Sequence, residues 1–231
     1  MPPFETLTCL SEELAENRQF SECSLASYIA SKVYYYLENY EKSLMLALDS
    51  DQKFDLNQRN QYVERLLNEC IDHYKRLKIA SLEAMKKGEM VASIDPKMEA
   101  VIDKMFQRCF NDKQYRHVIG VALECRRLDK VKEAIEKSGD EMEENLGYTF
   151  NIAQEIVTSK EFRTEVLRLL LVIYQNQSNQ GKFDPYKIAK CQFFLQIPEG
   201  TAQLLENLVK SQEEAFLNAY QIAFDICEKE D

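Results

Sequence analysis

Cys70 and His73 are the two side chains of this sequence best spaced to act together. They are three positions apart in a segment with helical periodicity, so both lie on one helix face. Such a pair is half of a zinc site, but no second cysteine–histidine pair is spaced to complete it. A nucleophile–base pair would need an orienting group and oxyanion donors, and neither is evident. Because Cys70 also belongs to the apolar stripe, a core position is the better interpretation.

The acidic clusters make no stronger case for catalysis. Asp49 and Asp51 lie at a predicted helix end, where carboxylates cap the helix or are solvated. Glu141, Glu143 and Glu144 form an acidic first turn, which suits the helix dipole. The motifs GxxxxGK[ST], GxGxxG, HExxH and GxSxG do not occur. The sequence therefore predicts no catalytic residues, no cofactor and no metal site, in a protein that is not an enzyme.

Charge and cysteine usage narrow the class of partner and the compartment. The net charge of −10 argues against nucleic acid and anionic membrane surfaces, which bind clustered Lys and Arg. The seven cysteines are an odd number without a CxxC pair, which suits buried thiols in a reducing compartment. The N-terminus lacks the pattern of a signal peptide, and the run Leu169–Tyr174 is too short to span a bilayer. We expect a cytoplasmic and nuclear protein.

Two further groups are candidate contact residues. Tyr34, Tyr35 and Tyr36 point about 100° apart on a helix, so one buried stripe cannot hold all three. At least one phenol should pack between helices or meet a partner, with packing favoured. The pair 126–127 is two arginines beside Asp129, for which pairing within the chain is favoured over a neighbouring subunit.

Helical periodicity runs through almost the whole chain. Apolar residues recur at steps of three, four and one, for example at Val63, Leu66, Leu67, Cys70 and Tyr74. No segment sustains a period of two, and glycine and proline are scarce, at 6 and 5 residues. We therefore predict an all-α fold of antiparallel helical hairpins stacked as an α-α superhelix or solenoid rod. The expected helices are 4–16, 22–38, 40–49, 59–86, 96–111, 113–125, 128–138, 141–159, 161–177, 185–196, 199–210 and 213–229.

The predicted boundaries have recognisable chemistry. Asp95-Pro96 and Asp184-Pro185 each offer a capping carboxylate followed by a proline at the first helical position, and Pro198 starts a helix likewise. Ser138-Gly139-Asp140 reads as a helix end, a left-handed glycine and the next cap, and residues 178–181 as a polar loop. We expect a single domain over residues 1–231, with a possible flexible joint at 78–95.

A degenerate repeat marks three of the helices. The segments Tyr40–Leu48, Tyr115–Leu123 and Phe216–Phe224 each begin with an aromatic residue and end with alanine and a large apolar residue. The small alanine allows a neighbouring helix to approach closely, and the aromatic ring fills the mouth of the hairpin. Repetition of this unit indicates a helical solenoid with hairpins of variable length.

The segment Asp103–Asp129, DKMFQRCFNDKQYRHVIGVALECRRLD, carries a specific likeness. It closely resembles the N-terminal region of the largest non-ATPase subunit in the base of the 26S proteasome regulatory particle. Other segments agree with this family in the same order, from about residue 20 to the end. They are Ala30–Leu37, Tyr62–Tyr74, Phe162–Arg168 and Ala219–Asp225.

The resemblance implies a non-catalytic scaffold. In that family the region is a rod of paired helices that leads into a closed ring of proteasome/cyclosome repeats. The subunit contacts lid subunits, the ATPase ring and ubiquitin-handling subunits, and does not itself cleave peptide or ubiquitin bonds. The sequence departs from the family by stopping at Asp231, before the ring repeats and the C-terminal receptor-recruiting segment. The first twenty residues and the stretch Lys78–Ile94 match poorly.

Three functions follow from these patterns. The first is a scaffold subunit of the proteasome regulatory particle base that supports ATP- and ubiquitin-dependent degradation, with direct ubiquitin contact left open. The second is a free-standing tetratricopeptide-like helical-repeat adaptor of another complex. The third, an all-α enzyme, is disfavoured by the empty motif search.

The repeat predicts that Ala122→Leu will lower the free energy of unfolding by about 1–3 kcal/mol, because the larger side chain overpacks the Tyr115 hairpin. Thermal melts of the two proteins measure this difference. An unchanged melt would contradict the close-packing role assigned to the alanine.

Overall fold

A computed structural model describes residues 11–15, 17, 20–50, 53–58, 60–88, 93–179, 184–210 and 213–230. Every regular element in these ranges is helical, and they contain no strand, so the predicted all-α fold is confirmed. The described chain forms two compact units, residues 1–130 and 131–231.

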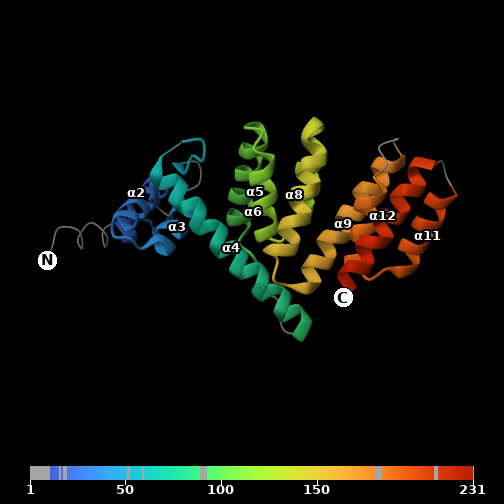
Figure 1. The fold of residues 1–231 in the computed structure, drawn as a ribbon. Helices are drawn as coiled ribbons and strands as arrows, with labels where there is room; N and C mark the ends of the chain where they lie inside the picture. Colours follow the sequence, from blue (N-terminus) through green and yellow to red (C-terminus); the bar gives the residue numbers. More distant parts are fainter. Residues whose placement is uncertain are drawn as a thin grey trace. The chain divides into compact units, whose positions relative to one another are not determined.

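The first unit is built from consecutive helices that pack against their neighbours in the chain (Figure 1). Helices α5 and α6 lie side by side in that figure as an antiparallel pair. Residues 11–15 are also helical, and α7 (Leu128–Lys137) crosses the boundary between the units. The other helices are α2 (Cys23–Tyr36), α3 (Tyr40–Asp49), α4 (Gln61–Lys87), α5 (Pro96–Asn111) and α6 (Tyr115–Glu124).

The second unit continues with the same plan. Helix α8 packs on α9, α9 on α10, and both α10 and α12 contact α11. Its core contains Leu146, Leu170, Ala189 and Ile222, each at most 2% exposed. The elements are η2 (Gly139–Glu141), α8 (Met142–Glu155), α9 (Lys160–Asn179), α10 (Pro185–Phe194), α11 (Pro198–Val209) and α12 (Glu213–Glu230).

The predicted proline caps are confirmed. Asp95 accepts a hydrogen bond from the Lys97 amide at 2.8 Å, and Asp184 accepts one from the Lys187 amide at 3.3 Å. The proline after each aspartate occupies the first helical position, and α11 begins at Pro198. These first turns satisfy amides that would otherwise lack a partner.

Two predicted boundaries need correction. Gly139 is left-handed as expected (φ +56°), but Asp140 lies within the short helix η2, and no side chain caps the start of α8. Residues 178 and 179 belong to α9 rather than to a loop, because the helical hydrogen bonds extend through Asn179; residues 180 and 181 lie outside the described ranges.

Helix α4 runs to Lys87 and so includes more than half of residues 78–95, where the sequence predicted a possible flexible joint. A loop there begins only at Gly88, whose left-handed conformation (φ +70°) ends the helix. Residues 89–92 lie outside the described ranges, and the flexible joint at 78–95 stays a prediction.

Four helix pairs are joined by the same three-residue turn, and its middle residue is left-handed without being glycine. These residues are Glu38, Lys113, Arg126 and Gln196, with φ of 54–59°. In each turn the third amide donates to the carbonyl five residues earlier, at 2.8–3.0 Å. The middle amide donates to the carbonyl three residues earlier. This is the Schellman pattern, which satisfies the last carbonyls of one helix while the chain reverses into the next.

A buried polar network joins α2 to α3. The Ser31 hydroxyl donates to the Ser43 carbonyl at 2.6 Å, and the Ser43 hydroxyl donates to the Ser31 carbonyl at 2.7 Å. The Ser31 hydroxyl already donates its only proton to the Ser43 carbonyl. It therefore accepts a hydrogen bond from the Tyr62 hydroxyl of α4, at 2.7 Å. Small residues at the crossing, including Ala30 and Ala47, are fully buried, so the two helices approach closely.

The repeat is matched by structure in two of its three copies. Helices α3 and α6 begin at the aromatic residue of the pattern, and Ala47 and Ala122 have no exposed surface. The third copy lies inside α12 rather than at its start, and its Phe224 is 66% exposed. The pattern in α12 therefore does not describe a packed hairpin mouth.

The turns predict that Lys113→Gly will raise the free energy of unfolding, by up to about 1 kcal/mol. A left-handed residue with a Cβ costs about 1–2 kcal/mol, offset partly by the greater freedom of glycine in the unfolded chain. Lys113→Val should lower the free energy of unfolding by about 1 kcal/mol or more, because a β-branched residue resists this conformation. Urea denaturation of the three proteins measures both; a valine variant as stable as the glycine variant would refute the interpretation.

Candidate functional site

The Cys70–His73 pair is assembled as core rather than as a reactive site. Cys70 has no exposed surface, and burial raises the pKa of its thiol to about 12. The His73 ring has its Nδ1 atom 4.0 Å from the Glu41 carboxylate of α3. Across the described ranges, no three His, Cys, Asp or Glu side chains gather in a way that would hold a metal ion.

The cysteines are mostly buried, as the sequence predicts. Cys70, Cys109, Cys125 and Cys191 are buried free thiols, whereas Cys23 is half-buried and Cys227 is exposed. Burial raises the pKa of Cys125 and Cys191 to about 12, so these thiols remain protonated at neutral pH and are poor nucleophiles.

The acidic residues act in helix packing. Asp49 pairs with Lys97 at 2.9 Å and so links the end of α3 to the start of α5. Glu143, in the first turn of α8, pairs with Lys187 of α10 at 2.6 Å. Asp51 lies outside the described residues. Asp49 and Glu143 each form an ion pair between helices, and that the clusters have no catalytic role stays a prediction.

The three consecutive tyrosines of α2 divide between packing and exposure, as predicted. Tyr35 lies edge-to-face against Tyr40 and Tyr62, with ring centroids 5.9 and 5.2 Å apart. The Tyr34 hydroxyl donates to the Glu12 carboxylate at 2.5 Å, which raises the pKa of Tyr34. Tyr36 is 78% exposed and is the phenol available to a partner.

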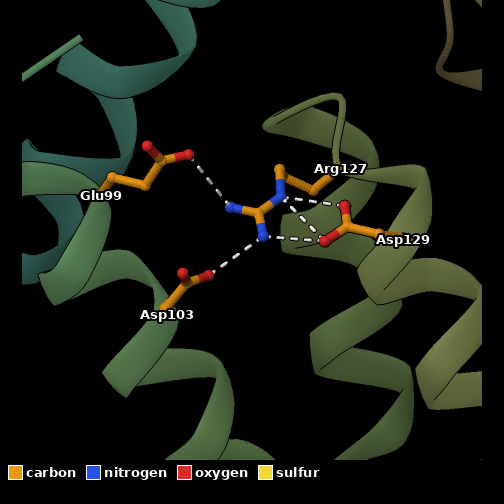
Figure 2. A network of polar contacts seen from close by, with 4 residues as sticks. All are labelled: Glu99, Asp103, Arg127 and Asp129. Carbon is orange, nitrogen blue, oxygen red and sulfur yellow. Dashed lines mark hydrogen bonds and ion pairs between the residues drawn. The ribbon is translucent and has the colours of Figure 1, made fainter. Parts of the chain in front are cut away.

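Arg127 gathers three carboxylates in the first unit (Figure 2). Its Nε and Nη2 atoms bind the two oxygens of Asp129 at 2.9 and 2.8 Å, and Nη2 also binds Asp103 at 3.1 Å. Nη1 lies 3.8 Å from Glu99. Asp103 and Glu99 belong to α5 and Asp129 to the first turn of α7, so the guanidinium fastens the α6–α7 turn to α5.

The electrostatics of this cluster follow from its geometry. The hydrogen bond with Asp129 raises the pKa of Arg127 against the opposing effect of burial, and the nearby Tyr74 hydroxyl adds to it without an aligned hydrogen bond. The same contact lowers the pKa of Asp129. The predicted pairing within the chain is confirmed, and the sequence did not reveal the two α5 carboxylates.

The last helix carries a second apolar stripe. Its first face, with Ala219 and Ile222, is buried against α10 and α11. The second face is exposed: Leu217 at 69%, Tyr220 at 51% and Phe224 at 66%. A helix that is apolar on two sides is typical of one packed on two sides. The sequence shows the steps of three and four between these residues. This spacing is interpreted above as part of the hairpin repeat.

Within the described residues, no helix combines the length and apolar character needed to cross a bilayer. The arrangement offers contact surface in an exposed tyrosine on α2 and an apolar stripe on α12, and ion pairs join some of the helices.

Comparison with known families places nearly the whole chain in one group. A family described as "26S proteasome subunit RPN2, N-terminal domain" matches residues 7–230.

Individual relatives agree with this match. The 26S proteasome non-ATPase regulatory subunit 1 of Drosophila melanogaster is 39% identical over 94% of this chain. Its homolog A in Arabidopsis thaliana is 39% identical over 99% of the chain. The 26S proteasome regulatory subunit RPN2 of Saccharomyces cerevisiae is 30% identical over 93%. The matched region is only 21–23% of the length of these relatives.

The Arg127 cluster predicts that Arg127→Met will lower the free energy of unfolding by about 1–3 kcal/mol at pH 7, because three carboxylates lose their shared cation. We expect no larger loss of stability, because the three carboxylates are about half exposed and water screens their attraction to the guanidinium. The exposed Arg168→Met should change stability by less than about 0.5 kcal/mol and serves as the control.

The same variant has a pH signature. The pKa of Asp129 is lowered by folding, so its contribution is present above its unfolded pKa of about 3.9 and is lost as pH falls through the lower folded pKa. The difference between wild type and Arg127→Met should therefore shrink below about pH 4 in urea titrations. A difference that stays constant down to pH 2 would contradict this account.

Proposed function

This chain belongs to the family of the N-terminal domain of 26S proteasome subunit RPN2, and from this membership we propose that it is a non-catalytic scaffold element of the proteasome regulatory particle. The match over residues 7–230 is the observation that carries the proposal. The chain spans about a fifth of the length of its curated relatives, so the proposal concerns the contacts of this region and not every activity of the longer proteins.

The fold supports a holding role. The hairpins are closed by short turns and cross-linked by Arg127 and by the Ser31–Ser43 pair, which favours a stiff array. We propose that residues 1–231 form a single domain, a superhelical rod of paired helices. The exposed stripe of α12 is a contact surface of the kind that such an array needs.

We propose the finer parts from the family resemblance, since the names of the relatives identify only a 26S proteasome regulatory subunit. The partners are other regulatory-particle subunits of the base and lid, including the ATPase ring, without nucleic acid or membrane. Localisation is cytoplasmic and nuclear. The relatives are named as regulatory subunits, and this supports a role without catalysis of its own.

The test is sedimentation of the epitope-tagged chain from cell extract, with ATP-dependent peptidase activity measured in each fraction. The chain should travel with the large ATP-dependent protease and cross-link to its regulatory subunits. A Leu217→Ser/Phe224→Ser variant should fold but shift toward slow fractions, whereas the exposed polar substitution Gln221→Ser on the same helix should not.

Recovery only in small complexes without ATPases would overturn the proteasome assignment. That result would favour the free-standing tetratricopeptide-like adaptor. Metal- or cofactor-dependent turnover by the purified chain would contradict the absence of catalysis.

A further inference from the structure

An open groove of about 670 Å³ lies in the first unit between α4, α5 and α6. Helix α4 contributes one wall with Glu64 and Asp72, α5 the floor with Met105, and α6 the opposite wall with Val121 and Glu124. Consecutive helices that pack side by side leave such a groove along their seam, and helical arrays bind partners in grooves of this kind. No residue of the Arg127 cluster lines it.

The floor of the groove is apolar and firmly held. Leu67, Met105 and Cys109 reach it with at most 8% of their surface exposed, and Ile71 and Val121 flank them half-buried. A floor made by core residues has a fixed shape, so an apolar side chain from outside would enter without reordering the helices.

The rim of the groove is acidic. Glu64, Asp72, Asp112 and Glu124 line it and are all exposed, against one arginine and one histidine. The arginine, Arg108, is partly engaged within the chain, because its Nη1 atom donates to the Leu56 carbonyl at 2.6 Å. Glu124 pairs with Lys75 at 3.3 Å but keeps 52% of its side chain exposed. The lining therefore carries four carboxylates against one guanidinium, a net negative formal charge, in a chain of net charge −10.

We propose that this groove binds a basic segment of another protein, with one apolar side chain seated on the Met105 floor and Lys or Arg side chains paired with the acidic rim. Charge complementarity selects this occupant, because a nucleic acid or an acidic peptide would be repelled by the same rim. The inference rests on the proposed function and deepens it, since it assigns the chemistry of one partner contact.

The test uses the intact chain and three fluorescein-labelled peptides of fourteen residues. The first places leucine at the i, i+4 and i+7 positions among lysines and arginines. The second replaces every basic residue with glutamate, and the third replaces every leucine with serine. Fluorescence anisotropy should detect saturable binding of the first peptide and none of the other two.

Charge reversal locates the binding. Glu64→Lys/Asp72→Lys should weaken the first peptide by about tenfold or more. Glu155→Lys/Glu228→Lys makes the same change in net charge at exposed positions of α8 and α12, which belong to the second unit and do not line the groove, and should weaken it by less than about twofold. Circular dichroism melts confirm that both variants fold. Equal weakening by the two variants, or no saturable binding by wild type, overturns the proposal.

A second readout separates this proposal from the proposed function. Sedimentation with the large protease is measured for the wild-type chain in the same study. Co-sedimentation without peptide binding overturns the groove and leaves the scaffold assignment standing. Saturable, groove-dependent binding without co-sedimentation supports the groove and removes the proteasome as its setting.

Discussion

The three-residue left-handed turn sets the geometry of the helix pairs on which this protein depends. In each of the turns at Glu38, Lys113, Arg126 and Gln196, two amides satisfy the last carbonyls of the preceding helix, and the next helix begins directly after the second of these amides. So short a connection brings the following helix back against the first, as in the α2–α3, α5–α6 and α10–α11 pairs. The conformational cost of a side chain in this region is distributed over several turns and is offset by the apolar faces that each reversal brings together.

Polar contacts then fix how the helices lie against one another. The reciprocal Ser31–Ser43 pair holds α2 against α3 at a distance that only small side chains permit, and Tyr62 ties α4 to the same point. Arg127 ties the α6–α7 turn to α5 in the same unit, with charged groups at a more solvated position. Apolar packing alone permits sliding along a helix axis, whereas a directional hydrogen bond has one best register.

The sequence predicted the helices closely because each has an apolar stripe and several carry a readable cap. The Asp95-Pro96 and Asp184-Pro185 starts are local chemistry and need no tertiary information. The left-handed turns escaped prediction since their middle residues, such as Lys113 and Gln196, carry no glycine signal. The Asp103 and Glu99 contacts of Arg127 escaped for another reason: they join residues more than twenty positions apart, and periodicity says nothing about which faces meet.

The two contact surfaces also differ in how far they could be predicted from the sequence. The exposed stripe of α12 was visible in the sequence as apolar spacing but was assigned to the hairpin repeat. The acidic groove could not be predicted, because its walls come from three helices whose relative placement depends on the turns and on the polar contacts between them.

The exposed stripe of α12 has a consequence for the life of the protein in the cell. A newly made chain that folds correctly still displays Leu217, Tyr220 and Phe224 to water until something covers them. Chaperones and degradation machinery bind such apolar surfaces, and triage of this kind sets the steady-state abundance of marginal proteins. Covering this stripe, whether by a further segment of the same polypeptide or by another protein, therefore removes apolar surface that otherwise favours self-association.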